Sequence, residues 1–400
     1  MKAMKKLVLV GLVLLASVMV LVGCDTNAGG SAEIINSEIG QVLTFSAESE
    51  QTLTVNVNGN YTLPDSLEYS VGGGDWTSLE AKTPISFGGA AGDLRMRGKS
   101  AGGMANSDVE YAYIVFGDDD VKVSCSGDIR TLVNYESPTT VDTSEARFSS
   151  LFKNCSVLTK APDLPAENLA DYCYDSMFYG CTSLTSAPAL DAKTLVPYCY
   201  AYMFSGCRSL TSAPVLDAKT LAAVCYGFMF EGCTSLDSAP ALPAKTLVPY
   251  CYYSMFEGCT SLTSAPALDA ETLAYSCYEG MFSGCTSLTS APELAADKLA
   301  DSCYWGMFSW CTNLTSAPAL PAETLAESCY ERMFYGCTSL DSVTMLATDI
   351  SADSCLDGWL ENVSENGTFT MAATMDESKF LRGINGIPSD WTVKNYDSQQ

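Results

Sequence analysis

The sequence predicts a solenoid of 26-residue coils, each with a short parallel strand and a short helix, preceded by a small N-terminal all-β domain. Three observations support this fold class. Cysteines recur every 26 residues in two series from residue 155 onward. Apolar residues recur with the same period, and one copy is too small to bury its apolar set without neighbours. Between residues 41 and 130, apolar and polar residues alternate as in strands.

The N-terminus has the features of an export signal. Three lysines precede an uncharged apolar stretch, so residues 1–23 are interpreted as a signal peptide. The stretch ends in Leu-Val-Gly-Cys, which resembles the lipobox of bacterial lipoproteins and implies that Cys24 is lipidated. The alternative is an ordinary signal peptide with an incidental cysteine. We expect residues 24–40 to form a flexible tether and the lipid to anchor the protein in a bacterial cell envelope, at the outer surface.

Residues 41–130 are predicted to form the small β domain, as an antiparallel sheet or a small sandwich. Leu53, Val55 and Val57 alternate with polar residues, so one face of that strand is buried. The run Asp118–Asp120 lacks the ligand spacing of a calcium loop and is interpreted as a hairpin turn. Strands are expected at 42–47, 52–58, 66–71, 85–87, 93–97, 110–116 and 121–125.

Each coil is predicted to contain one helix and one strand. In the copy that starts at Cys251, Tyr252, Met255 and Phe256 have the i, i+3, i+4 spacing of a helix, which predicts a helix ending at Gly258. The following alternation over residues 262–268 predicts an inward-facing strand. A proline recurs in that strand and cannot donate a ladder hydrogen bond, so the strand should be very short.

The recurring stretch MFxGCTSLTSAP resembles the BspA-like leucine-rich repeats of bacterial surface proteins. One copy carries the match at Phe256, Cys259, Leu262 and Ala265, and the resemblance covers about residues 148–363. It implies a leucine-rich-repeat solenoid, placed here at residues 131–363, that binds other molecules. The repeat pattern decays at both ends, as expected of capping coils. Residues 364–400, with strands expected near 367–371 and 391–394, are interpreted as a C-terminal cap.

Three interpretations of the repeated cysteines are considered. Zinc is disfavoured because the two cysteines of a copy are separated by seven residues, whereas structural zinc sites use Cys-x2–4-Cys. A disulfide within one coil is disfavoured because the predicted helix would hold the cysteines about 12 Å apart. Disulfides along one column are geometrically possible at a spacing of about 4.8 Å. We favour buried thiols that act as small apolar side chains.

The composition excludes several functions. With 47 acidic and 21 basic residues, the chain has a net charge of −26, so nucleic-acid binding is not expected. The chain has no histidine, which rules out Ser-His-Asp and Cys-His catalysis and His-ligated metals. A glycosidase with paired carboxylates would need a singular cleft, which a periodic array does not offer. We therefore predict no enzymatic activity, no catalytic residue, no cofactor and no metal.

The columns that vary from copy to copy are the candidate binding positions. They place Tyr202, Phe228, Tyr253, Trp305 and Trp310 on the predicted helical face. Either these aromatic residues form an exposed band that anchors a partner, or they are partly buried between neighbouring helices. We expect adhesion or protein–protein interaction, with a protein, or a glycan, on a host or neighbouring cell as partner. The alternatives are a carbohydrate-binding surface lipoprotein and a purely structural envelope protein.

Overall fold

The structure is a computed structural model that describes residues 41–383 and 386–396. The predicted signal peptide, Cys24 and the tether lie outside the described residues. Within the described part of the chain, no helix is long and apolar enough to span a membrane.

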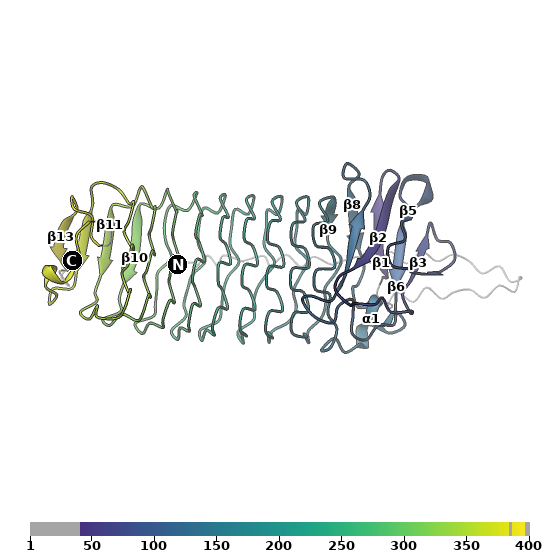
Figure 1. Cartoon of the computed structure of the whole chain (residues 1–400), viewed down its shortest axis with the longest axis horizontal. Coiled ribbons are helices and arrows are strands. Elements are labelled where there is room, and N and C mark those ends of the chain that lie inside the picture. Colours follow the sequence, from purple (N-terminus) through teal and green to yellow (C-terminus); the bar gives the residue numbers. More distant parts are fainter. Residues whose placement is uncertain (1–40, 384–385, 397–400) are drawn as a thin grey trace, which may run out of the picture. The chain divides into compact units, whose positions relative to one another are not determined.

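The N-terminal strands form two sheets with one shared core (Figure 1). The sheet orders are β4-β3-β6-β1-β8-β9 and β5-β2-β7. The rings of Phe45 and Phe116, one from each sheet, are 6.2 Å apart. All seven predicted strands are confirmed, and only the short β4 was not predicted. The elements of this region are β1 (Leu43–Ala47), β2 (Gln51–Val57), β3 (Glu68–Val71), β4 (Thr77–Ser78), β5 (Ile85–Phe87), η1 (Gly89–Ala91), β6 (Leu94–Arg97), β7 (Ala112–Phe116), β8 (Val123–Ser126), α1 (Thr131–Asn134) and η2 (Pro138–Thr140).

The first coil of the array is joined directly to these sheets. Its strand, β9 (Leu158–Lys160), pairs in parallel with β8. The Met104 amide donates to the Arg147 carbonyl at 2.6 Å, and the Ile114 amide donates to the Leu151 carbonyl at 2.8 Å. The N-terminal sheets therefore supply donors to the first coil, and one continuous hydrophobic core runs from the sheets into the array.

The predicted short helices are wrong, because the segment between the two cysteines of each coil is a series of tight turns. In residues 250–258, Tyr250, Ser254 and Gly258 have φ values of +59°, +47° and +69°. A left-handed residue at every fourth position prevents an α-helix, which requires consecutive right-handed residues. The spacing of Tyr252, Met255 and Phe256 results from these turns, which bury the same three side chains.

Stacking on the next coil explains why these turns form. Alternate amides donate within the coil, as from Glu257 to the Ser254 carbonyl at 3.1 Å. The intervening amides donate to the following coil, as from Phe256 to the Met281 carbonyl at 2.9 Å. Both classes of amide are therefore paired, and a helix would forfeit the bonds between coils. Equivalent bonds join the successive coils, which lie stacked between β9 and β10 in Figure 1.

Identical side chains stack along the inside of the array. The rings of Tyr226 and Tyr252 are 5.8 Å apart and 3° from parallel, and the Phe column stacks in the same way.

The described chain contains seventeen cysteines, all buried free thiols, in agreement with the favoured interpretation. The second cysteine column also has a polar role. The Cys259 thiol donates to the Phe230 carbonyl of the preceding coil at 3.1 Å, and the equivalent bond recurs in neighbouring coils.

The opposite side of each coil is nearly free of regular strand, as the recurring proline predicts. In the central copies it makes only isolated bridges, such as Leu268 to Leu294. Strands reappear at the C-terminal end, where the parallel order is β10-β11-β12-β13. The β10 strand still contains Pro318, and its register with β11 shifts between Ser316 and Ala319. The bounds are β10 (Ser316–Leu320), β11 (Ser342–Met345), β12 (Thr368–Met371), η3 (Glu377–Lys379) and β13 (Thr392–Asn395).

Candidate binding surface

We define the turn face as the outward side of the segment from the residue before the first cysteine of each coil to the residue before the second. In the copy at Cys251 this segment is 250–258. Its Tyr, Met and Phe columns point inward and are buried, as is Ser254, so the outward side is formed by Tyr250, Tyr253, Glu257 and Gly258. These outward positions are the variable columns, and all five predicted binding residues lie on this face.

Three of the predicted residues form one contiguous group, here called the Tyr202 cluster. The rings of Tyr202 and Phe228 stack at 4.4 Å and 8°. The ring of Tyr253 meets Phe228 edge-on at 4.7 Å. All three side chains are half-buried. The two interpretations of the sequence therefore both apply: the rings pack between neighbouring coils and also keep one side open to solvent.

The two tryptophans lie farther along the array, in one coil. Trp310 is 51% exposed, and its ring meets Tyr335 at 5.2 Å. Trp305 is half-buried. The Arg332 guanidinium lies 6.0 Å from the Trp305 ring and 5.9 Å from the Tyr335 ring, so it lies near both. These residues form a second, smaller aromatic group on the turn face.

Several of these aromatic residues occupy strained backbone positions. Tyr202, Phe228 and Trp310 have φ values of +54°, +56° and +62°, a region that favours glycine. Trp310 stands where the neighbouring copies have glycine, as at Gly284 and Gly336. A left-handed non-glycine residue costs about 1 kcal/mol or more. Because the Trp310 indole is exposed, its packing contacts offset little of this conformational free energy.

Carboxylates surround the Tyr202 cluster. The Ser205 hydroxyl donates to Glu231 at 3.0 Å, and burial raises the pKa of that carboxyl, with Glu257 adding to the effect. Burial also raises the pKa of Glu279. Burial, with these acids nearby, raises the pKa of Tyr253 to about 12. The cluster thus combines open ring faces with negative charge, which suits a cationic partner.

Further aromatic residues on this face were missed by the sequence analysis. The rings of Tyr172 and Tyr198 stack at 4.6 Å, and Tyr250 contacts both Tyr253 and Tyr275. Most of them occupy the column just before the first cysteine, which the sequence analysis did not consider. The residue type in that column varies from copy to copy and includes valine and serine. This variation is the signal that could have identified the column as a candidate binding position.

Comparison with known families agrees with this architecture. Residues 131–237, 200–317 and 252–369 match the BspA type Leucine rich repeat region, in six copies. The chain belongs to the BspA-type leucine-rich repeat family. Its members are repeat proteins of protein–protein interaction or adhesion in general, and the family is typically non-enzymatic. No curated protein and no solved structure gives a significant match.

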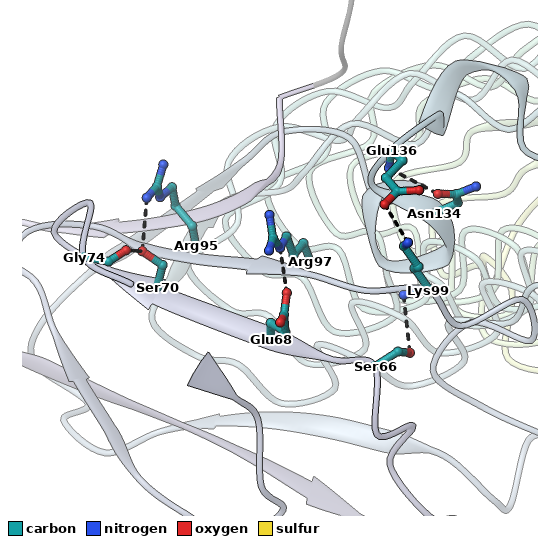
Figure 2. Close-up of polar contacts among 9 residues, drawn as sticks. All are labelled: Ser66, Glu68, Ser70, Gly74, Arg95, Arg97, Lys99, Asn134 and Glu136. Carbon is teal, nitrogen blue, oxygen red and sulfur yellow. Dashed lines mark hydrogen bonds and ion pairs between the residues drawn. The ribbon is translucent and has the colours of Figure 1, made fainter. Parts of the chain in front are cut away.

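Outside the BspA-type repeats, a charged cluster lies on β6 (Figure 2). The Arg97 guanidinium stacks on Trp76 at 3.9 Å and donates to Glu68 at 2.8 Å. Lys99 donates to Glu136 at 2.6 Å. Both cations are neutralised by these carboxylates, so the cluster serves to hold β3 and the segment after α1 against β6. Among the described residues, no group of three or more His, Cys, Asp or Glu could hold a metal ion.

The Asp118–Asp120 run forms an exposed turn between β7 and β8, but the predicted hairpin is wrong, because β7 pairs with β2 while β8 pairs with β1 and β9 in the other sheet. The Asp120 amide donates to the Asp118 side chain at 2.9 Å, and all three aspartates are exposed. The Gln51 side chain donates to the Asp118 carbonyl at 2.7 Å and fixes the start of the turn. The Asp118 carboxylate thus stabilises the turn itself, and the Asp119 carboxylate accepts from the Ser156 hydroxyl of the first coil at 3.4 Å.

Proposed function

We propose that this protein is a lipoprotein, anchored through Cys24 at the outer surface of a bacterial cell, that attaches the cell to a protein on a host or neighbouring cell. The observation that carries the proposal is the gathering of aromatic residues on the turn face, where the Tyr202 cluster keeps one side of its rings open and Trp310 is 51% exposed. Tyrosine and tryptophan are also the residue types enriched in the energetic centres of protein interfaces.

The negative charge of the turn face favours a partner with a positively charged surface. Glu231, Glu257 and Glu279 surround the Tyr202 cluster, and the whole chain is strongly acidic. Arginine and lysine side chains can stack on the rings and pair with the carboxylates. We therefore propose a partner with a basic surface, whose attachment weakens as salt is added.

Protease treatment of intact cells tests the surface location. The protein should be degraded on whole cells to the same extent as in permeabilised cells. A periplasmic protein of the same cells should survive until the cells are permeabilised, which controls for leakage. Survival of this protein on whole cells would contradict adhesion and would favour a structural role inside the envelope.

A further inference from the structure

A cavity of about 380 Å³ lies where β7 meets the first coil. It is independent of the turn-face residues considered above. Its floor is apolar and includes Ile114 and Val157, and the Cys155 thiol donates to the Ile114 carbonyl at 3.2 Å. The Ile114 amide in turn donates to Leu151 of the first coil at 2.8 Å. Both sides of the floor are therefore fixed by hydrogen bonds, so the cavity is preformed.

Tyrosine rings form one wall of the cavity. On β7, Ala112, Ile114 and Phe116 point inward, so Tyr111 and Tyr113 share the outward side of the strand. Their ring centroids are 6.1 Å apart and the rings are inclined by 66°. Both side chains are half-buried, which leaves ring surface open toward the cavity. Such rings offer a flat, electron-rich face to a ligand.

The rim carries hydrogen-bonding groups of mixed character. Asn58, Asn154, Ser156 and Asp119 all line the cavity, and the Ser156 hydroxyl donates to Asp119 at 3.4 Å. The Asn58 amide donates to the Val109 carbonyl at 2.8 Å, which leaves its side-chain oxygen available as an acceptor. Asn154 has no side-chain hydrogen bond to another described residue. The rim therefore offers both hydrogen-bond donors and acceptors.

The ammonium group of Lys153 limits the charge of a ligand. The Lys153 residue lines the cavity, and its ammonium group lies 5.2 Å from the centroid of the Tyr179 ring, which is not part of the lining. Among the described residues, it pairs with no carboxylate within 4.0 Å. It would therefore repel a cationic ligand, although the chain as a whole is acidic. An entirely apolar ligand would leave the amide and carboxylate groups of the rim without partners, which is costly.

We propose that this cavity binds a saccharide. A pyranose ring has an apolar face of C–H groups that can pack on Tyr113, and its edge of hydroxyl groups both donates and accepts hydrogen bonds. Asn58, Asn154 and Lys153 lie at the rim to bind those hydroxyl groups. The cavity volume falls within the range of small-ligand sites and suits one or two sugar rings.

Saturation-transfer NMR tests the proposal with methyl glycosides of glucose, galactose, N-acetylglucosamine and N-acetylneuraminic acid. At least one glycoside should receive saturation from the parent protein at its ring protons. Tyr113→Ala should weaken its binding at least tenfold. Tyr275→Ala removes a more exposed tyrosine (46% exposed) that does not line the cavity, and this variant should bind as the parent does. If Lys153→Gln abolishes binding of N-acetylneuraminic acid alone, the ammonium recognises the sugar carboxylate.

Asn154→Gly keeps the test decisive if Tyr113→Ala fails to fold. Asn154 has a φ of +62°, which glycine adopts without strain, so this variant removes only the amide side chain. It should also weaken binding at least tenfold. The proposal is overturned if no glycoside of the panel receives saturation from the parent, or if folded Tyr113→Ala and Asn154→Gly bind as tightly as the parent.

Discussion

The indole of Trp310 lies directly on Gly336, the glycine at the same position of the following coil. A Cβ atom at Gly336 would be 2.7 Å from Trp310 Cε3. From Gly206 to Gly284 the glycines of this column face one another, as Gly258 faces Gly232 with a corresponding distance of 3.7 Å, whereas Gly180 faces the Asn154 side chain. The glycine at 336 is therefore what leaves room for an aromatic residue at 310.

Replacing Gly336 by alanine should displace the indole. Gly336 and Gly258 have φ values of +74° and +69°, so alanine costs about 1–2 kcal/mol at either site. Gly336→Ala should lower the free energy of unfolding by about 1 kcal/mol more than Gly258→Ala, because only there does the new methyl group collide with a ring. Urea denaturation measures the difference, and tryptophan emission should shift only in Gly336→Ala. Equal losses would show that the indole moves aside freely.

Replacing Trp310 by glycine should weaken attachment to the partner while changing stability little. Trp310→Gly removes the left-handed strain and loses the contacts of a half-exposed ring with Tyr335 and Gly336, so the free energy of unfolding should change by less than about 1 kcal/mol. Attachment to the partner should weaken. Thermal unfolding and a binding assay on the same sample test both parts. A loss of several kcal/mol in stability would instead assign Trp310 to the core.

The cysteine columns should be unreactive in the folded protein. They are buried, and burial raises the pKa of Cys259 and Cys277 to about 12, so the thiolate is absent at pH 8. A thiol reagent should label almost nothing in the native protein. In denaturant without reductant it should label many equivalents, up to the seventeen cysteines of the described chain. Labelling near zero before reduction would show that these cysteines form disulfides.

Stability should fall as the pH rises from about 4 to 7 because of Asp175. Burial, together with Asp108, raises the pKa of Asp175 to about 7, above its ordinary value of 3.8. Between these values the folded state binds the proton more tightly, so its stabilising effect is lost as pH approaches and passes 7. Asp175→Asn should be more stable than the parent at pH 8 and less dependent on pH over this range. If the free energy of unfolding depends on pH in the same way in the two proteins, the raised pKa of Asp175 is contradicted.

The period of the sequence was sufficient to predict the coils, the inward columns and the weak strand at the proline. It could not distinguish a helix from consecutive turns, because both place Tyr252, Met255 and Phe256 on one side. The deciding feature is the left-handed backbone at Tyr250 and Ser254, which neither residue type signals. Amide bonds to the next coil stabilise that backbone, and they exist only once the coils are stacked.

The candidate sites were predictable to different degrees. The turn-face aromatics stand out in the sequence as variation within a repeating frame. The cavity beside β7 could not be found in this way. It brings Tyr113 together with Asn154, and their positions depend on how the first coil docks against an edge strand. No periodic pattern links these two parts of the chain.

The turn face is the surface proposed to bind the partner. Beads coated with the protein can be counted on a layer of cultured epithelial cells, at low and high salt. Trp305→Ala combined with Trp310→Ala should reduce attachment strongly, since anchor residues contribute about 2 kcal/mol or more each. Ser290→Ala combined with Ser316→Ala, on the opposite side of the coils, should attach as the parent does. Unchanged attachment by the folded double tryptophan variant, or its loss in the serine variant, would contradict the account.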